Sequence, residues 1–266
     1  MKKTITITYN DYAVSEQVAN LLKEKLCQAD FDARFTYDGS EELLVAIGGD
    51  GAFLKAMHDF DFPKIPIVGV NTGHLGFFQD IQPDELDVFI HAYQNENYSI
   101  QEIYPLSAVI FYKDKVRSVK AINDIVLRSS LGKTVHLDLR INGTFIECFR
   151  GDGLIISSTT GSTAYNYSAG GAIVDPSIKT LQLTPLAPLN TNAYRSFTSS
   201  IISSWDSDIK VGTEESDRNH ISLLLDGVQK HYNDFKQLQV TTCKESIHLV
   251  RMKNYEFWNK VTDKFL

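Results

Sequence analysis

The chain has 266 residues, a length that fits one large domain or two modest ones. Hydrophobic residues make up 43% and charged residues 22%, a globular balance that excludes an intrinsically disordered chain. The 26 basic and 33 acidic residues give a formal net charge of −7, which excludes a partner held mainly by the phosphates of long nucleic acid. One small phosphorylated ligand is still compatible with this charge, because a helix N-terminus binds phosphate without net positive charge.

Cysteine usage and the N-terminal residues predict a cytoplasmic protein. Cys27, Cys148 and Cys243 are odd in number and far apart, so neither a disulfide framework nor a thiolate zinc site is indicated. Residues 4–8 alternate polar and apolar side chains, where a secretory signal has an apolar run of roughly 7–15 residues. No run approaches the ~18 apolar residues of a membrane span, so we expect no membrane contact. The seven histidines are scattered, with no His-x-x-x-His or His-x-His pair, so we expect no protein-built transition-metal site.

Strand and helix patterns alternate over the first hundred residues, which predicts an α/β domain with an open parallel sheet. The second and third strand patterns are continuous apolar runs, which suit parallel strands buried on both faces. The strand patterns fall at residues 4–9, 43–47 and 66–70, and the helical stripes at residues 14–26, 53–57 and 86–93.

After residue 100 the patterns change to short strands, which predicts a mostly β C-terminal domain. The clearest hairpin has Asn142-Gly143 between two strand patterns, because this dipeptide supplies the positive φ angles of a type I′ turn. We therefore expect an α/β nucleotide-binding domain at residues 1–100 and a β-rich domain at residues 101–250. Residues 251–266 contain a short amphipathic helix that we expect to pack back on the first domain.

The segment Gly48-Gly49-Asp50-Gly51 lies between a buried-strand pattern and a helical one. Ligands bind at the carboxyl ends of strands in open α/β sheets, and glycines there let the backbone approach a phosphate. A carboxylate in such a loop repels phosphate unless it has a task, such as accepting a hydroxyl proton or holding a metal ion. The alternative is a tight turn that uses Asp-Gly only for its φ angles.

A second triplet, Gly151-Asp152-Gly153, leads into residues 157–171, which are dense in serine, threonine and glycine. Such a segment is costly to order and buries little, so it suits the lining of a polar ligand, with its backbone and hydroxyl groups facing that ligand. Tyr165 and Tyr167 within it suit stacking on a base or a nicotinamide ring. A flexible surface loop is the alternative.

Five segments follow one another at residues 48–51, 71–77, 123–124, 150–153 and 160–165. In this order they resemble the NAD kinase family, and the resemblance runs through most of the chain. The Gly-Asp-Gly element also occurs in phosphofructokinases and in related lipid kinases, whereas the Thr-Gly-Ser-Thr-Ala-Tyr segment is much more specific. The resemblance implies an α/β N-terminal domain followed by a β-rich domain that binds NAD and forms the oligomer.

The resemblance also implies roles for individual residues. Asp50 is expected to accept the proton of the 2′-hydroxyl group on the adenosine ribose of NAD, with Gly51 beside it at the ligand. Asn123 and Asp124 match a pair that grips the adenosine part, and Phe77 matches an aromatic beside the adenine. The other expected NAD contacts, of which Arg150 and Asp152 act partly across a subunit interface, are Arg150, Asp152, Thr160, Thr163, Ala164, Tyr165, Asn166, Tyr167, Ser168 and Ala187.

The activity implied by the resemblance is transfer of the terminal phosphoryl group of ATP to NAD, giving NADP, with Mg²⁺ offsetting phosphate charge in a homotetramer. Two positions depart from the family: Asp124 replaces a Glu and is one methylene shorter, and Thr159 replaces a Pro. Two rival functions stay open. A lipid kinase of the same superfamily predicts an exposed apolar entry or a basic patch. A non-catalytic NAD-binding regulator would not need Asp50.

Overall fold

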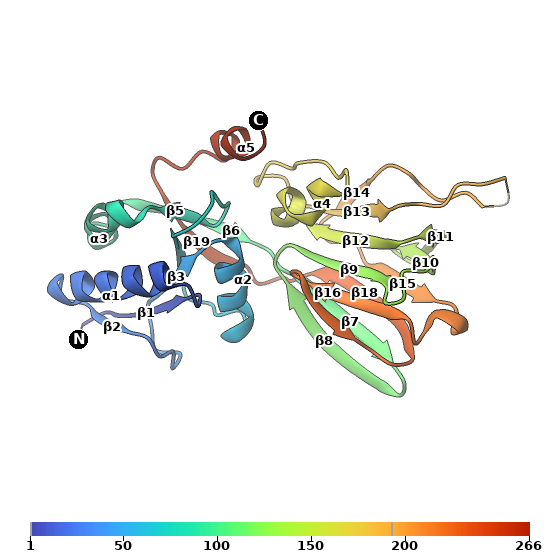
Figure 1. The fold of residues 1–266 in the computed structure, drawn as a ribbon, viewed down its shortest axis with the longest axis horizontal. Helices are drawn as coiled ribbons and strands as arrows, with labels where there is room; N and C mark the ends of the chain where they lie inside the picture. The colour runs from blue at the N-terminus through green and yellow to red at the C-terminus, as the bar shows by residue number, and fades with distance from the viewer. Residues whose placement is uncertain (1, 193) are drawn as a thin grey trace. The chain divides into compact units, whose positions relative to one another are not determined.

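The computed structural model describes residues 2–192 and 194–266, which divide into two compact units. The first unit comprises the described part of Met1–Ile103 together with Ser246–Leu266, and the second comprises that of Tyr104–Glu245. Each unit has its own hydrophobic core. In Figure 1 the first unit runs from blue to cyan and ends in red, and the second runs from green to orange.

A seven-stranded sheet forms the centre of the first unit. Its strands are β1 (Thr4–Tyr9), β2 (Asp32–Arg34), β3 (Leu43–Gly48), β4 (Ile67–Asn71), β5 (Gln79–Ile81), β6 (Tyr98–Ile103) and β19 (Ile247–Met252). The order is β2-β1-β3-β4-β19-β6, and β5 pairs with β4. All of these pairs are parallel except β19 with β6, so the predicted open parallel sheet is confirmed with one antiparallel pair added.

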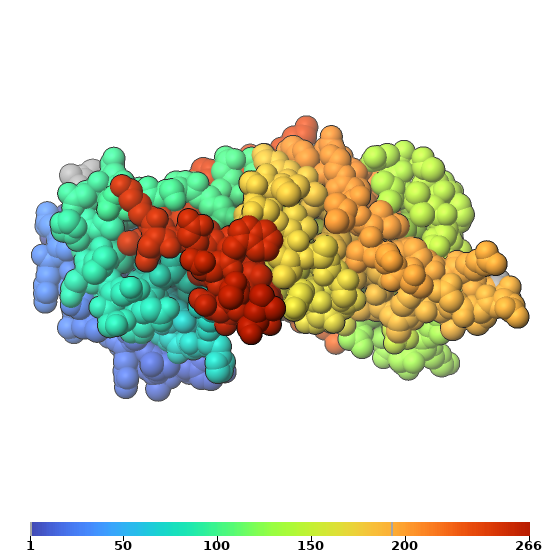
Figure 2. All heavy atoms as spheres, turned by 90° about the horizontal axis from the view of Figure 1, so that it is seen from above, coloured from blue at the N-terminus to red at the C-terminus, as the bar shows by residue number. Residues whose placement is uncertain are grey.

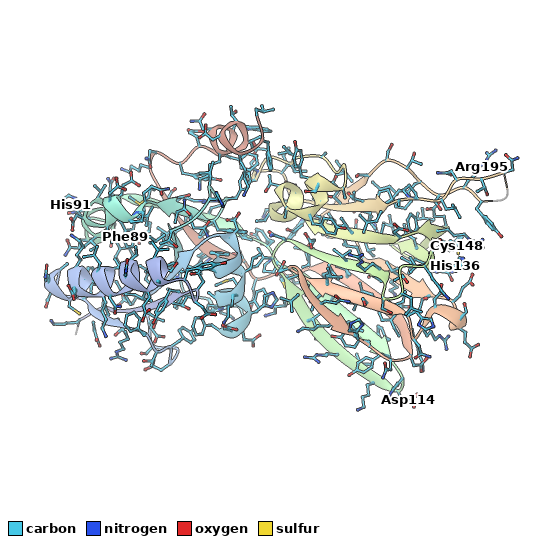
Figure 3. The ribbon with its side chains drawn as sticks, viewed as in Figure 1. Phe89, His91, Asp114, His136, Cys148 and Arg195 are labelled. Carbon is cyan, nitrogen blue, oxygen red and sulfur yellow. The ribbon has the colours of Figure 1, made fainter. Side chains whose placement is uncertain are left out.

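Helices cover both faces of this sheet. They are α1 (Ala13–Gln28), α2 (Asp50–Asp59) and α3 (Leu86–Gln94), which follows a 3-10 turn at Pro83–Glu85. From β1 the chain passes through α1 to β2, which lies next to β1 at one edge of the sheet. From β3 it passes through α2 to β4, which lies in the opposite direction along the sheet. Because such crossovers are right-handed, α1 and α2 lie on opposite faces. On α3, Phe89 points into the core while His91 is exposed (Figure 3).

Strand β19 belongs to the first unit, although the sequence analysis assigned residues 246–250 to the β-rich domain. It pairs with β4 and β6, and its Val250 packs in the core of the first unit. An apolar run has the same local pattern whichever sheet it joins, so the sequence could not identify its partner strands. The chain ends in α5 (Phe257–Phe265), which lies on the surface of the first unit and is dark red in Figure 2.

Two six-stranded antiparallel sheets pack together in the second unit. The first contains β7 (Leu106–Tyr112), β8 (Lys115–Ala121), β10 (Val135–Ile141), β11 (Thr144–Gly151), β15 (Ile209–Thr213) and β18 (Phe235–Thr242). The second contains β9 (Asp124–Ser129), β12 (Gly153–Ser158), β13 (Thr180–Leu186), β14 (Ile201–Ser204), β16 (Ile221–Leu225) and β17 (Val228–His231). Leu137 of β10 and Ile156 of β12 share one core, so this unit is a β-sandwich, as the mostly β prediction requires.

The predicted hairpin at Asn142-Gly143 is confirmed. Strands β10 and β11 pair antiparallel on either side of it, with Ile141 opposite Thr144. The φ angles of Asn142 and Gly143 are +51° and +80°, as a type I′ turn requires. The remaining short helical elements of this unit are the 3-10 turns Thr160–Thr163 and Glu215–Asp217 and the helix α4 (Tyr165–Ser168).

Candidate active site

The carboxyl ends of β1 and β3 border a pocket of about 470 Å³ in the first unit. These two neighbouring strands continue toward opposite edges of the sheet, and such a switch point is where open α/β sheets bind ligands. The pocket is therefore the first candidate site. Its lining consists of Asn10, Tyr12, Gly49, Asp50, Gly51, Ala52, Lys55, Thr72, Gly73, His74, Leu75, Gly76 and Lys264.

Two helices begin at this pocket. Tyr12 precedes α1 and Gly49 precedes α2, and neither helix has a side-chain cap on its first N–H groups. Uncapped N–H groups and the helix dipole favour an anion, so this part of the lining suits phosphate. The turn itself depends on Gly48, whose φ is +145° and where a Cβ would lie 2.6 Å from the Cβ of Ala52. Only glycine fits that position without displacing the helix.

Asp50 is the only carboxylate among the described residues that line the pocket. Its Oδ2 accepts a hydrogen bond from the Phe77 N–H at 3.2 Å, and its Oδ1 accepts one from the Phe78 N–H at 3.0 Å. A Cβ at Gly76 would lie 2.4 Å from Asp50 Oδ1, so the missing side chain there leaves room for the carboxylate. The backbone of residues 76–78 thus fixes the direction of the Asp50 carboxylate.

Phe77 lies beneath the C-terminal helix. It is only 7% exposed, and its ring centroid is 5.8 Å from that of Phe257 and 5.9 Å from that of Phe265. The Lys264 ammonium group lies 5.0 Å from the same ring. The contact between Phe77 and an adenine stays a prediction, and it requires that the ring be uncovered.

In the second unit, the start of β9 touches the segment that follows β12. The Asn123 carbonyl oxygen accepts a hydrogen bond from the Ser158 N–H at 2.9 Å, and Ser158 Oγ accepts one from the Gly161 N–H at 3.0 Å. A Cβ at Gly161 would lie 1.9 Å from the Asn123 carbonyl oxygen, so the two backbones are in direct contact. The structure therefore places the predicted residues Asn123 and Asp124 beside Thr160.

Asn123 and Asp124 are buried, with exposed fractions of 8% and 4%. The Asn123 Oδ1 is buried without a hydrogen-bond partner among the described residues. Burial, and then the charge of Asp226, raises the pKa of Asp124 to about 7. Asp226 itself accepts the N–H groups of Ile122, Asn123 and Asp124 at 2.8, 2.7 and 3.4 Å. An unpaired buried acceptor beside a carboxyl group that titrates near neutrality indicates a ligand-binding position.

The serine- and threonine-rich segment differs from the expectation that its hydroxyl groups face a ligand. Ser157, Ser158 and Ser162 are buried, with exposed fractions of 0%, 4% and 1%. Ser158 Oγ donates to the Ile122 carbonyl at 2.6 Å, and Thr159 Oγ1 donates to the Ile178 carbonyl at 2.8 Å. These hydroxyl groups satisfy backbone groups instead, because a tight non-helical segment leaves many carbonyl and N–H groups without partners.

On helix α4, one predicted NAD-binding side chain is buried and others are exposed. Asn166 is completely buried: its Nδ2 donates to the Ser162 carbonyl at 3.2 Å, and its Oδ1 accepts from Thr184 Oγ1 at 2.6 Å. Asn166 therefore anchors the helix. Tyr165 and Tyr167 are 39% and 37% exposed, so their rings are accessible at the surface. The other predicted residues here are the partly buried Thr160, Thr163 and Ala164 and the exposed Ser168.

Arg150, Asp152 and Ala187 form a separate cluster. The Asp152 N–H donates to the carbonyl of Leu186 at 2.9 Å, next to Ala187, whose φ is +41°. The Arg150 guanidinium group lies 3.6 Å from the ring centroid of Tyr194. The sequence analysis did not single out Tyr194, because nothing in its local pattern distinguishes it from other loop tyrosines.

Strand β12 lies between the two groups of predicted residues in the second unit. Asp152 precedes it, whereas its last residues pair with the start of β9 at Asp124. Six residues of strand span about 20 Å. Within one chain, Arg150 and Asp152 are therefore far from Asn123 and Asp124, and the two groups do not form one compact site.

Two further residues were also missed, Lys264 in the first unit and Asp226 in the second. Lys264 lies at the pocket through a contact with Asp50 that joins residues 214 positions apart, a separation that no local pattern encodes. Asp226 precedes Gly227, and this dipeptide predicts a turn. The φ of Asp226, +48°, agrees with that turn. The sequence signal identified neither the three N–H groups that Asp226 binds nor its effect on Asp124.

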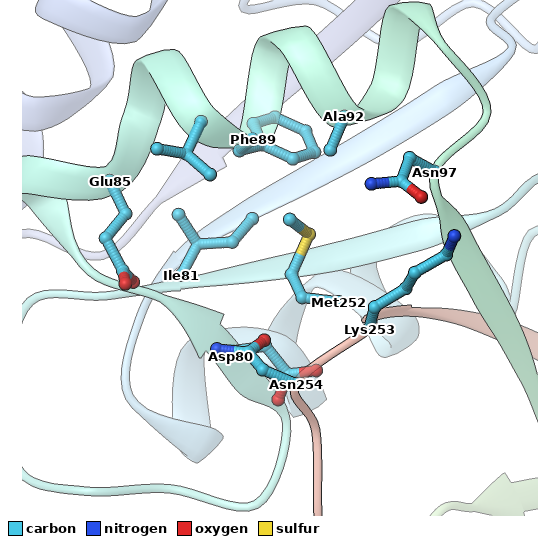
Figure 4. A pocket seen from close by; sticks show the side chains of 10 residues that line it. Asp80, Ile81, Glu85, Phe89, Ala92, Asn97, Met252, Lys253 and Asn254 are labelled. Atoms are coloured by element: carbon cyan, nitrogen blue, oxygen red, sulfur yellow. The ribbon is translucent and has the colours of Figure 1, made fainter.

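A second, smaller cavity of about 220 Å³ lies between α3 and β19 (Figure 4). Ile81, Phe89, Ala92 and Met252 give it an apolar wall, and Asp80 and Glu85 are among its polar residues. None of the predicted site residues lines it.

The described residues contain no group of three or more His, Cys, Asp or Glu side chains that could hold a metal ion. In nucleotide sites Mg²⁺ is held by one or two carboxylates together with substrate phosphates and water. Asp50 is one such carboxylate in the larger pocket. The donor set therefore fits a Mg²⁺ ion that arrives with a nucleotide, and does not form a resident metal cage.

Comparison with solved structures identifies the class of fold. A yeast NADH kinase in complex with NADH superposes with a TM-score of 0.82 at 21% identity, covering 99% of this chain and 87% of that one. An NAD kinase from Archaeoglobus fulgidus in complex with ATP superposes with a TM-score of 0.76 at 22% identity, covering 97% of this chain and 98% of that one. The two-unit architecture is thus that of the NAD and NADH kinases.

Sequence relatives then identify the family. Residues 7–98 match the ATP-NAD kinase N-terminal domain, and residues 122–252 match the ATP-NAD kinase C-terminal domain. The NAD kinase of Finegoldia magna is 39% identical over 99% of this chain and 98% of its own length. That of Staphylococcus aureus strain Newman is 31% identical over 97% of each chain. The chain belongs to the ATP-NAD kinase family, which confirms the resemblance.

Proposed function

We propose that this protein is an NAD kinase, which transfers the terminal phosphoryl group of ATP to the 2′-hydroxyl group of the adenosine ribose of NAD. One observation carries the proposal: a single, rigidly held carboxylate, Asp50, stands in a pocket whose two uncapped helix N-termini suit phosphate. A carboxylate there repels a triphosphate, and a role in the reaction explains why it is present. Asp50 is proposed to orient the hydroxyl group and accept its proton as the new P–O bond forms.

Two groups of residues in the second unit are proposed to contact NAD. In the second unit, the unpaired Asn123 Oδ1 supports a ligand donor at that position, and the exposed rings of Tyr165 and Tyr167 support stacking. Arg150 and Asp152 lie at the far end of β12 from Asn123. This separation supports the proposal that they serve the site of another copy in a homotetramer.

Mg²⁺ is proposed to accompany ATP and to offset charge on the transferring phosphoryl group. A cytoplasmic location is also proposed. It is supported by the three cysteines, which are all free, since a reducing compartment keeps thiols unpaired. Among the described residues, no helix is both long and apolar enough to cross a membrane.

The decisive experiment incubates the purified protein with ATP, Mg²⁺ and NAD and measures NADP. NADP formation that depends on all three components supports the proposal. Binding of NAD without any NADP would instead favour the non-catalytic regulator. Phosphorylation of a diacylglycerol or sphingoid lipid in vesicles, with NAD left unmodified, would favour the lipid kinase.

A further inference from the structure

We propose that Lys264, on the C-terminal helix, is a substrate-binding residue whose ammonium group contacts the phosphoryl group that ATP donates. The proposal rests on the function proposed above, and it adds a residue from the far end of the chain to the same pocket. Lys264 lines this pocket, and its Nζ lies 3.3 Å from Asp50 Oδ2.

The contact with Asp50 is a loose one. A charge-assisted N–H···O bond is typically 2.7–2.9 Å long, so 3.3 Å is long for such a bond. The Lys264 side chain is 30% exposed, and an ion pair of that kind contributes little to stability. The Asp50 carboxylate is already oriented by the N–H groups of Phe77 and Phe78. Lys264 is therefore not needed to hold Asp50, and its ammonium group is available to a ligand.

The helix that carries Lys264 is, by contrast, firmly anchored. Lys260, one turn earlier on the same face, donates to the carbonyls of Gly76 and Gln79 at 3.1 and 2.6 Å and to Asp80 Oδ1 at 2.7 Å. Burial lowers the pKa of Lys260, and the Asp80 charge opposes that effect. Phe257 and Phe265 pack on Phe77 from the same helix. Lys264 is thus held at the pocket by a helix that three other side chains, Phe257, Lys260 and Phe265, attach to the first unit.

The charge of the pocket shows why a lysine is needed here. Among its described lining residues, the two lysines are Lys264 and Lys55, and Lys55 forms an exposed ion pair with Asp59 one turn along α2. Lys264 is the one beside Asp50. A phosphoryl group positioned for attack near Asp50 meets the carboxylate's repulsion, and the Lys264 ammonium group offsets it. Charge develops on that phosphoryl group in the transition state, where such a contact has its largest effect.

The test compares Lys264→Met with wild type. The substitution keeps side-chain length and removes the charge, and we expect kcat/KM for ATP to fall by about 100-fold. We expect the KM for NAD to change by no more than about twofold, because the contact is to the other substrate. Lys264→Arg should restore most of the loss. Asp263→Asn, an exposed charge change on the same helix, is the matched control and should behave as wild type.

Two binding measurements separate this contact from a structural effect. Calorimetry should show weaker ATP binding in Lys264→Met, and inorganic tripolyphosphate should compete with ATP less strongly, while adenosine competes as in wild type. The thermal melt of the ligand-free variant should match that of wild type.

Equal affinity of both proteins for ATP and tripolyphosphate would overturn the proposal. A rise in kcat for Lys264→Met would also overturn it, since the lysine would then restrain Asp50. Failure of the wild-type protein to form NADP would contradict the proposed function. The binding measurements would still test the role of Lys264, because they do not depend on NADP formation.

Discussion

Replacement of Asp124 by Asn is expected to stabilise the ligand-free protein at pH 8 and to change its stability little at pH 4. Asp124 is 4% exposed, and burial together with the charge of Asp226 raises its pKa from 3.8 to about 7. In the unfolded chain the same carboxyl group titrates near its ordinary value. Asn has the shape of the protonated carboxyl group and cannot ionise, so the substitution removes the cost of a buried charge.

The sign and size follow from proton linkage. Below pH 4 the carboxyl group is protonated in both states, and its contribution to stability is fully present. Between pH 4 and 7 the unfolded chain loses the proton and the folded protein keeps it, so stability falls as pH rises. A shift of about 3 units corresponds to at most about 4 kcal/mol, which is lost in full above pH 7. Asp124→Asn should therefore flatten the pH profile by an amount of this order.

Urea unfolding at pH 4, 6 and 8 tests the prediction. The chain has two tryptophans, so a Trp258→Phe background leaves Trp205 of the second unit as the fluorescent probe. The matched control is Asp114→Asn, whose carboxyl group is fully exposed at the turn between β7 and β8 (Figure 3). The reasoning is refuted if Asp124→Asn is less stable than wild type at pH 8, or if both variants keep the wild-type pH dependence.

Three further predictions concern single substitutions. Asp50→Asn should lower turnover at least about 100-fold while leaving the melting temperature and most NAD binding intact; kinetics near wild type would make Asp50 a turn residue. Gly161→Ala should cost about 3 kcal/mol or more, because its Cβ would lie 1.9 Å from the Asn123 carbonyl oxygen, whereas Gly212→Ala, with 3.7 Å to its nearest neighbour, should melt nearly as wild type does. Tyr165→Phe should keep NAD affinity and Tyr165→Ala should lose roughly 1–3 kcal/mol of it by calorimetry. An Ala variant that melts far lower yet binds NAD normally would show that this ring is structural.

Local patterns predicted the parts of the fold that local physics determines. The apolar run of β3 and the glycines after it located both a buried strand and the turn at its end, because both strand faces are covered and Gly48 must adopt a positive φ. The Asn142-Gly143 turn was predictable for the same kind of reason. The partner strands of β19 were not, since pairing across more than 140 residues leaves no local signal.

The candidate site was predictable only in part, for the same reason. Motif order identified Asp50, but its contact with Lys264 depends on how the last helix folds back across the first unit. The burial of Phe77 under that helix was likewise not predictable, because the residues that cover it lie about 180 positions further along the chain. Composition also did not show that Ser158 and Ser162 bond to the backbone in the interior. Residue type alone does not distinguish a hydroxyl group that serves a ligand from one that serves the fold.

The start of β9 carries two features that weaken the ligand-free protein. Asn123 leaves a buried oxygen unpaired, and Asp124 keeps a carboxyl group in an environment that opposes its charge. Each costs stability, and an apolar pair of similar size would avoid both costs. The Asn123 backbone lies against Gly161, where no side chain can intervene, and Asp124 follows it directly in the chain. Such a combination is understandable if a ligand with hydrogen-bond donors completes it, and the stability that Asp124→Asn gains without NAD should then be offset by weaker binding when NAD is present.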